Sequence, residues 1–423
     1  MIKRNLLANY LGTAFVAVSQ IVIIPLYLRF LGEHDWGLLS SLLALAATLL
    51  ILEAGVSQAV ARGISEQNVH AQMIDRRAFQ IVERRYLALT LSSSALLALI
   101  AGKLGPMLLP QAGAHATAFV FVAIAMAASQ IVGSLYRGAL VGHGAQVRLN
   151  ALVVAVTLVR HAFGLTLAAR GYGVVSVALA LAASFVTEAA LRRWLVSHLL
   201  SSHTSSEGAP TSQPDSFVAR GALVLAFAGM IGALATQLDR LILGASISAV
   251  DLGRYAIAAT LSLAVLQLVY PISNALIPHL KDFQDSGTGR GRGLLKRSYR
   301  MLFAILLPVW AGAALVAAKG LQWWLPHFES ADVASVVAPL FLIHLVGTSF
   351  NALCVPMYLT LLARHLDRRI FIANLCSISV LIVTLKTLIP HYGATAGSVA
   401  WLLSNATLLM LYFAVYRRSL KHQ

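Results

Sequence analysis

Charged side chains inside long apolar stretches are the residues of this sequence most able to do chemistry. A charge at the centre of a bilayer costs roughly 2.5–3.5 kcal/mol on insertion scales, so each one needs a reason to be there. Arginines in such positions can line a cavity for an anionic substrate, and carboxylates can take up a coupling ion or orient an arginine. The candidates are Arg29, Arg62, Arg160, Arg240, Arg254, Glu53 and Asp239.

Arg160 lies near the middle of the apolar stretch 149–169, too deep for its side chain to reach the membrane surface easily. Two interpretations are open. Arg160 either is a cavity cation for an anionic substrate or forms a structural ion pair with a carboxylate on another helix. Glu188 and Arg192, four residues apart in a later stretch, are interpreted as a pair on a helix surface.

Asp239 and Arg240 are adjacent in the stretch 219–246, in the outer third of the bilayer. They either face the outer headgroups as a pair, or Arg240 contacts substrate while Asp239 titrates or orients it. Arg29 and Arg254 stand at the outer ends of their stretches. There they either anchor the helix by snorkelling or line the same outer vestibule.

Glu53 lies in the inner half of the stretch 36–61, and Arg62 follows at its end. A carboxylate in that position can couple transport to a proton or sodium gradient. A partner such as Arg62 or Arg160 would instead hold it in its charged form. Both interpretations stay open.

The overall composition indicates a membrane protein. Of 423 residues, 58% are hydrophobic and 11% are charged, and the mean hydropathy is +0.78, so water is not the main solvent. We predict an all-α polytopic membrane protein with about twelve transmembrane helices in two six-helix bundles around a central cavity, since roughly 20 apolar residues span a bilayer. The expected spans are 5–31, 36–61, 86–109, 115–137, 149–169, 172–195, 219–246, 252–280, 298–325, 332–362, 370–389 and 392–416.

Most of the 32 Lys and Arg residues fall on alternate loops between these spans, which predicts an orientation. Because cytoplasmic loops retain positive charge, we place both termini in the cytoplasm. The same rule explains the formal net charge of +16, so we expect no nucleic-acid partner. Cys354 and Cys376 lie in apolar stretches without metal-ligand spacing, so we expect no metal site.

A segment rich in Ser, Thr and Pro divides the chain into halves. We predict an N-terminal six-helix bundle over 1–200, a cytoplasmic linker over 201–218 and a C-terminal six-helix bundle over 219–423. Similar sequences at 31–37 and 250–255 precede the second helix of each half. The halves would form a parallel repeat and could rock about the cavity.

Motifs of covalent chemistry are absent from the sequence. We find no Gly-rich phosphate loop, no His-Glu-x-x-His and no nucleophile elbow. We therefore expect a transporter rather than an enzyme, with no cofactor.

Several short patterns resemble a known family. The stretches 9–12, 24–32 and 53–57 look like the N-terminal pattern of Wzx-type bacterial polysaccharide and O-antigen flippases, which belong to the multidrug/oligosaccharidyl-lipid/polysaccharide exporter superfamily. Residues 237–240, with 253–255, are similar to the start of that family's second half.

This resemblance implies a lipid-linked substrate, undecaprenyl diphosphate bearing an oligosaccharide. A flippase would move it by alternating access from the cytoplasmic to the periplasmic leaflet of the bacterial inner membrane. The cavity arginines would meet the diphosphate or acidic sugars, since a planar guanidinium binds phosphate oxygens in pairs. Membrane lipid, the polysaccharide polymerase and the chain-length machinery are the implied partners.

Three other functions compete with this one. A multidrug or cation antiporter of the same superfamily would need an acidic and aromatic cavity, whereas the deep charges here are mostly arginines. Peptidoglycan-precursor flippases usually have two extra helices. A membrane-integral polysaccharide polymerase needs a sizeable loop for its catalytic groups, and the expected outer loops are very short.

Overall fold

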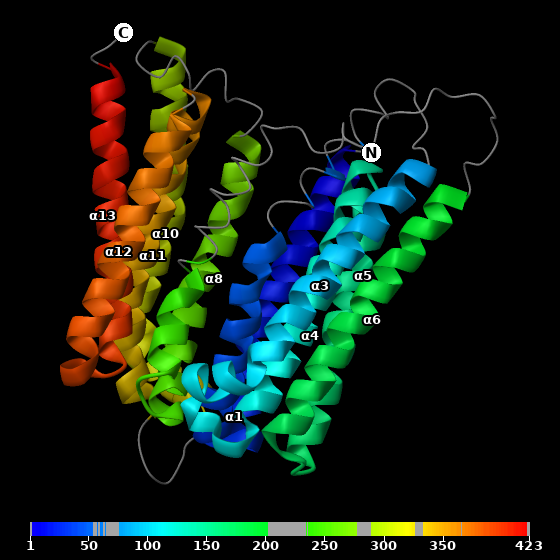
Figure 1. Cartoon of the computed structure of the whole chain (residues 1–423). Helices are drawn as coiled ribbons and strands as arrows, with labels where there is room; N and C mark the ends of the chain where they lie inside the picture. Colours follow the sequence, from blue (N-terminus) through cyan, green and yellow to red (C-terminus); the bar gives the residue numbers. More distant parts are fainter. Residues whose placement is uncertain are drawn as a thin grey trace, which may run out of the picture. The chain divides into compact units, whose positions relative to one another are not determined.

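The computed structural model describes residues 2–53, 57, 60, 61, 64, 76–201, 234, 236–276, 289–325, 333–364 and 366–420. Within these residues the regular structure is helical and contains no strand. Figure 1 shows long helices in both halves of the described chain. The prediction of an all-α protein is confirmed.

The described N-terminal half is a series of long helices joined by short connections. Two short 3-10 helices, η1 and η2, follow the first and second of the long ones. In chain order the elements are α1 (Ile2–Leu49), η1 (Leu50–Glu53), α3 (Arg76–Leu108), η2 (Pro110–His115), α4 (Ala116–Gly142), α5 (Gln146–Ala169) and α6 (Gly173–Ser201).

The described C-terminal half begins with a helical stretch over 236–244. Long helices follow it, and several contain proline, which neighbouring helices can accommodate in a membrane. They are α8 (Ala249–Leu276), α10 (Gly289–Trp324), α11 (Val333–Ala363), α12 (Asp367–Tyr392) and α13 (Thr395–Leu420).

Ten of the described helices are long and apolar enough to cross a membrane. One of them, α1, contains the predicted span 5–31 and residues 36–49 of the predicted span 36–61. Gly32 interrupts its helical conformation with φ 78° and ψ 172°, a conformation that glycine adopts without steric cost. The expected loop between the two spans is therefore a break at one residue. The predicted span 219–246 is described only at 234 and 236–246.

The chain forms two compact units. The N-terminal unit comprises Met1–Val18 and Ser41–Gln237, and the C-terminal unit comprises Ser19–Ser40 and Leu238–Gln423. The middle of α1 thus belongs to the C-terminal unit. The division into 1–200, 201–218 and 219–423 stays a prediction, and the linker 201–218 lies outside the described residues except for Ser201.

Helix α4 is central to the N-terminal unit, where it packs against α3 and α6. Leu135, Tyr136 and Leu140 of α4 form a buried cluster with Val196 of α6. Helix α5 packs against α6, on which Val196 lies. A charged side chain on the side of α5 that contacts α6 therefore lies between two packed helices.

Helix α11 is central to the C-terminal unit and packs against α8, α10 and α13. A Cβ atom on Gly347 of α11 would lie 2.6 Å from the Trp401 ring of α13. The absence of a side chain at this position lets the two helices approach closely, as in many membrane bundles. The close approach brings the polar side chains of α11 and α13 into contact.

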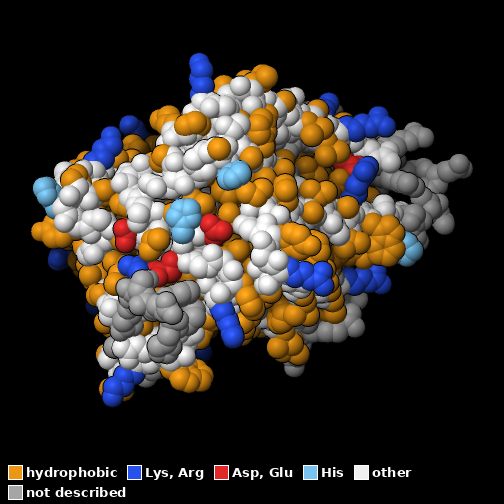
Figure 2. All heavy atoms as spheres, turned by 90° about the horizontal axis from the view of Figure 1, so that it is seen from below, with side chains coloured by type: hydrophobic (Ala, Val, Ile, Leu, Met, Phe, Trp, Pro, Cys, Tyr) orange, Lys and Arg blue, Asp and Glu red, His pale blue; other side chains and the backbone are white. Residues whose placement is uncertain are grey.

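Many large hydrophobic side chains point outward in both units. Leu99 is 83% exposed, Leu315 is 82% exposed and Trp323 is 87% exposed. Figure 2 shows hydrophobic side chains spread over much of the visible face. Such surfaces are unfavourable in water and suit lipid, so the protein is a multi-pass membrane protein.

Candidate functional site

Two buried polar clusters surround two of the candidate residues, Arg160 and Asp239. The arginine cluster of the N-terminal unit consists of Arg160, Ser184, Glu188 and Arg192. The histidine network of the C-terminal unit consists of Asp239, Tyr255, Ser262, His344, Thr348 and Trp401.

The arginine cluster is built around one carboxylate. Arg160 of α5 pairs with one oxygen of Glu188 on α6, and Arg192 of α6 pairs with the other. Arg160 Nε also donates to Ser184 Oγ at 2.7 Å. The Phe185 ring lies 3.8 Å from Arg160 Cζ, in cation–π geometry. The side chains of the three charged residues are only 10–14% exposed.

Arg160 thus forms an ion pair with a carboxylate on another helix, which is the arrangement that one of its two interpretations predicts. The interpretation of Glu188 and Arg192 as a surface pair was wrong, because Glu188 is buried and also engages Arg160. Two guanidinium groups share one carboxylate, so the three side chains carry a net positive charge. Arg192 Nε is buried and has no hydrogen-bond partner among the described residues. The cluster therefore keeps spare donor capacity for an anion.

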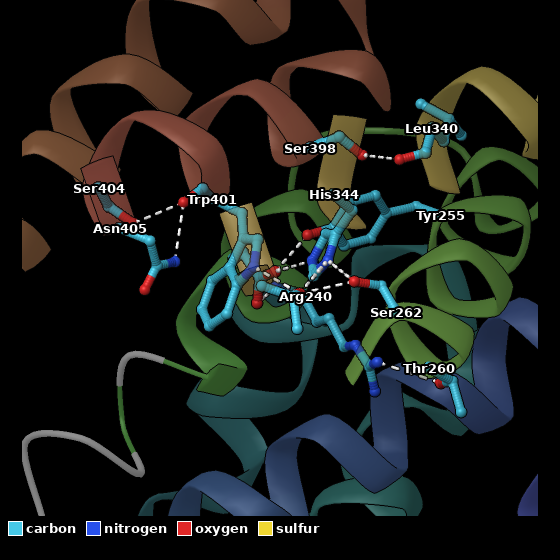
Figure 3. A network of polar contacts seen from close by, with 12 residues as sticks. Arg240, Tyr255, Thr260, Ser262, Leu340, His344, Ser398, Trp401, Ser404 and Asn405 are labelled. Atoms are coloured by element: carbon cyan, nitrogen blue, oxygen red, sulfur yellow. Dashed lines mark hydrogen bonds and ion pairs between the residues drawn. The ribbon is translucent and has the colours of Figure 1, made fainter. Parts of the chain in front are cut away.

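The histidine network surrounds Asp239, which is 2% exposed. Its carboxylate accepts a hydrogen bond from the Tyr255 hydroxyl of α8 and another, at 2.7 Å, from the Arg240 backbone N–H. His344 of α11 places Nε2 at 3.9 Å from Asp239 Oδ2. Three separate helical segments thus meet at one buried carboxylate, as Figure 3 shows for the labelled residues around it.

Hydroxyl groups hold the other side of the imidazole. His344 Nδ1 lies 3.0 Å from Ser262 Oγ and 3.4 Å from Thr348 Oγ1. Trp401 of α13 donates from Nε1 to Thr348 Oγ1 at 3.1 Å and stacks on the imidazole with ring centroids 5.1 Å apart. His344, Ser262 and Thr348 have no exposed surface. The network is therefore rigidly packed and closed to bulk water.

Arg240 points away from this network. Its guanidinium donates to Thr260 Oγ1 of α8 at 3.1 Å, as seen in the lower right part of Figure 3. Only its backbone N–H contacts Asp239. Arg240 Nε is buried and has no hydrogen-bond partner among the described residues. The two adjacent residues thus have different surroundings, and the guanidinium keeps a free donor.

Arg254 forms an ion pair near the N-terminal end of α8, directly before Tyr255 in the chain. Its Nε lies 2.6 Å from Glu33 Oε2, and both side chains are mostly buried. Trp36 Nε1 donates to the Gly253 carbonyl at 3.2 Å beside this pair. The similar sequences 31–37 and 250–255 therefore contact each other within the C-terminal unit.

The remaining predicted site residues stand apart. Arg29 is exposed on α1. Glu53 ends η1, and its carboxylate accepts the Ser57 backbone N–H at 3.3 Å. Arg62 lies outside the described residues. The structure thus brings Arg160 to Glu188, Arg254 to Glu33 and Asp239 to His344.

Sequence reasoning missed His344, Tyr255 and Trp401 as site residues. His344 had a usable signal, because a titratable side chain stands in the middle of the predicted span 332–362. Tyr255 and Trp401 had none, since aromatic residues are ordinary in membrane helices. Their roles depend on the packing of α8 and α13 against α11.

Long apolar helices in two units, with charged residues buried between helices, form a multi-pass membrane fold, and solved structures of transporters share this fold. A multidrug resistance MATE family transporter of the MOP superfamily, in an inward-facing conformation, aligns with TM-score 0.70 and 13% identity over 97% of this chain and 95% of that chain. The lipid II flippase MurJ aligns with TM-score 0.69 and 10% identity over 97% of this chain and 87% of that one.

A MOP superfamily transporter from Pyrococcus furiosus also aligns, with TM-score 0.62 and 16% identity over 99% of this chain and 95% of that chain. At these identities the likeness concerns the fold. The family model described as "Polysaccharide biosynthesis protein" matches residues 2–284, more than half of the chain. The chain belongs to this family, so the resemblance inferred from its sequence is confirmed. No relative was found among curated proteins.

Proposed function

We propose that this protein is a flippase for undecaprenyl-diphosphate-linked oligosaccharide. It moves the lipid-linked saccharide from the cytoplasmic to the periplasmic leaflet by alternating access, for O-antigen or exopolysaccharide biosynthesis. The observation that supports this most strongly is the match to the polysaccharide biosynthesis family on a chain with a transporter fold. No covalent chemistry is part of the proposal.

Buried positive charge supports an anionic substrate. Arg160 and Arg192 share the single carboxylate of Glu188, and Arg240 keeps a free Nε donor among the described residues. A guanidinium in a dry site binds phosphate oxygens through paired N–H donors. The proposed substrate contacts are the candidate arginines Arg29, Arg62, Arg160, Arg240 and Arg254.

Two of these arginines already hold a carboxylate, so substrate binding would exchange one anion for another. Arg160 would leave Glu188, and Arg254 would leave Glu33. Such an exchange keeps each guanidinium paired throughout, which avoids the cost of an uncompensated buried charge. Glu53 and Asp239 are the proposed ion-coupling or structural carboxylates.

The proposed membrane rests on the family resemblance, and the proposed orientation rests on charge segregation in the sequence. The protein lies in the bacterial inner membrane with both termini in the cytoplasm, where precursors are assembled. Its proposed partners besides lipid are the polysaccharide polymerase and the chain-length machinery.

Reconstitution tests the function directly. The purified protein is placed in liposomes whose outer leaflet carries a labelled undecaprenyl diphosphate saccharide, and a membrane-impermeant glycosidase reports how much label stays outside. We expect protein-dependent loss of accessible label. Label that stays fully accessible in vesicles with folded protein would reject the proposal.

An antiporter for cationic drugs is the second candidate, because the structural likeness includes a multidrug resistance transporter. The histidine network is acidic and aromatic, as such a site would need. However, Tyr255 is 0% exposed and Trp401 is 2% exposed, which leaves their rings closed against other side chains. Growth of an expressing strain with cationic dyes separates the two functions, since only an antiporter should raise resistance.

A further inference from the structure

His344 is a buried titratable side chain that the proposed saccharide contacts do not use. It lies inside α11, with no exposed surface, and faces an acidic residue that is also sealed. A histidine in a membrane-spanning helix is costly unless it pairs with another group, and such residues often belong to proton pathways. The pair of Asp239 and His344 therefore calls for a functional explanation.

The hydrogen bonds around the imidazole leave one nitrogen for the carboxylate. Nδ1 lies within hydrogen-bond distance of the Ser262 and Thr348 hydroxyls. Nε2 faces Asp239 Oδ2 at 3.9 Å and has no hydrogen-bond partner among the described residues. Without a proton on Nε2, two acceptors would face each other across this gap. The 3.9 Å gap is too long for a hydrogen bond and fits the neutral tautomer whose single N–H lies on Nδ1 and donates to Ser262 Oγ. A second proton, on Nε2, places a donor opposite the carboxylate.

We propose that Asp239 and His344 bind one proton between them, and that this proton is the ion exchanged by the C-terminal unit as the transporter cycles. The inference rests on the proposed transport function and specifies its coupling ion. A proton from the aqueous phase forms an N–H bond at His344 Nε2, and the imidazolium pairs with the Asp239 carboxylate. Release of the proton restores the neutral imidazole, so charge and atoms balance.

The donors around Asp239 argue against sodium. A hard cation requires several oxygen ligands with free lone pairs. The Asp239 carboxylate is instead occupied by two hydrogen donors, the Tyr255 hydroxyl and the Arg240 backbone N–H. Its third neighbour is an imidazole nitrogen. This set suits a proton and offers a sodium ion only one anionic group.

The charged and titratable groups that act on His344 in the described structure are few. Asp239 and Arg240 come from 236–244, and Tyr255 comes from α8. The helices α10, α12 and α13 contribute uncharged side chains to the surrounding core, namely Leu306, Leu381 and Trp401. Occupancy of the proton site should therefore depend mainly on the Asp239–His344 pair and on the positive charge of Arg240.

Proton binding can also change helix packing. A charge-assisted hydrogen bond needs about 2.7–2.9 Å, so the 3.9 Å gap would close by about 1 Å. That movement would pull the segment 236–244 toward α11. Because Arg240 follows Asp239 directly, the movement would shift a proposed substrate contact. The geometry thus offers a direct link between proton uptake and substrate release.

Trp401 provides an optical test, because its indole stacks on the imidazole with an interplanar angle of 10°. A protonated imidazole in contact with indole quenches its fluorescence more strongly than a neutral one. Because Trp194 also stacks on a histidine, the exposed His198, the parent protein for the test is the full-length Trp194→Phe variant. We would titrate its tryptophan fluorescence in lipid nanodiscs from about pH 5 to 8, the range in which histidine changes charge. We expect reversible quenching on acidification, unchanged by added sodium chloride relative to potassium chloride.

Single substitutions identify the residues that cause the fluorescence quenching. His344→Gln and Trp401→Phe should each abolish the acid quenching. His391→Gln and Trp323→Phe alter exposed residues and should keep it. If His344→Gln folds poorly, Trp401→Phe replaces it as the test variant. It removes the indole that reports on the imidazole and retains the Asp239–His344 pair. In the Trp194→Phe parent, three results would each overturn the proposal: quenching that persists when Trp401→Phe is added, a flat titration, or a response to sodium at constant pH.

A transport experiment separates this proposal from the proposed function. In saccharide-loaded liposomes, an imposed pH gradient should change the rate of wild-type translocation several-fold and leave the rate of His344→Gln unchanged. An equal pH response in His344→Gln would overturn the proton site while saccharide transport stands. Acid quenching that requires His344, in a protein that moves no saccharide, would support the proton site and reject the saccharide.

Discussion

The arginine cluster and the histidine network are both buried, yet they differ in what a proton can do to them. In the arginine cluster, two guanidinium groups hold Glu188, and arginine stays charged at any physiological pH. In the histidine network, the cation-forming group is an imidazole, which exists in both a neutral and a protonated form. The first is suited to permanent pairing or to binding an anion, and the second is suited to switching.

Their connections to the helices differ in the same way. The arginine cluster joins α5 to α6 through charged contacts, and Arg192 also reaches the Gly133 carbonyl of α4 at 3.3 Å. The histidine network joins four segments through mostly neutral hydrogen bonds and stacked rings. A network of mostly neutral groups loses less free energy of unfolding when one member is replaced. Substitutions in the two clusters should therefore differ in how strongly they destabilise the protein.

Glu188→Ala should have the largest effect on stability. It leaves Arg160 and Arg192 without their carboxylate in a dry site, and breaking a buried ion pair costs about 3–5 kcal/mol. Thermal unfolding of the purified protein in detergent measures the loss. A loss near zero would mean that water reaches both guanidinium groups, and the cluster would then not be a buried structural pair.

Arg160→Ala should destabilise less, by about 1.5–3 kcal/mol, because Glu188 keeps Arg192 as a partner. The same variant tests the cavity-cation interpretation when saccharide export is divided by the amount of folded protein. We expect that ratio to fall to background. Normal export per folded molecule would leave Arg160 with a structural role only.

Tyr255→Phe should cost about 1–2 kcal/mol. It removes one donor from Asp239, which keeps the Arg240 backbone N–H. The same unfolding assay measures it beside Glu188→Ala. If the Tyr255→Phe loss equalled or exceeded the Glu188→Ala loss, the contrast between a charged and a mostly neutral cluster would be wrong.

Arg193→Gln should have the smallest effect, about 0–1 kcal/mol, and serves as the matched control for the arginine cluster. Arg193 lies on the same helix as Arg192 and pairs with Glu83 at 2.9 Å, but its side chain is 62% exposed. A loss as large as that of Glu188→Ala would show that burial does not explain the difference between the two arginine pairs.

Sequence reasoning predicted the helices well and the contacts poorly. The apolar run 332–362 matches α11, Val333–Ala363, because hydrocarbon thickness and helix rise set its length. The midspan position of Arg160 required a partner or a ligand, but several carboxylates were available. Glu188 is the partner in the structure, and its buried position could not be read from an i,i+4 spacing that is equally common on exposed helices.

The sequence by itself determined that this chain is a helical membrane protein of the polysaccharide biosynthesis family, because hydropathy and short family patterns are local properties of the chain. Only the tertiary structure decided which charges meet. Asp239 and His344 are separated by more than 100 residues, and their contact depends on how 236–244, α8 and α11 pack. Pairing of buried charges is a property of helix packing, and no local pattern in the sequence encodes it.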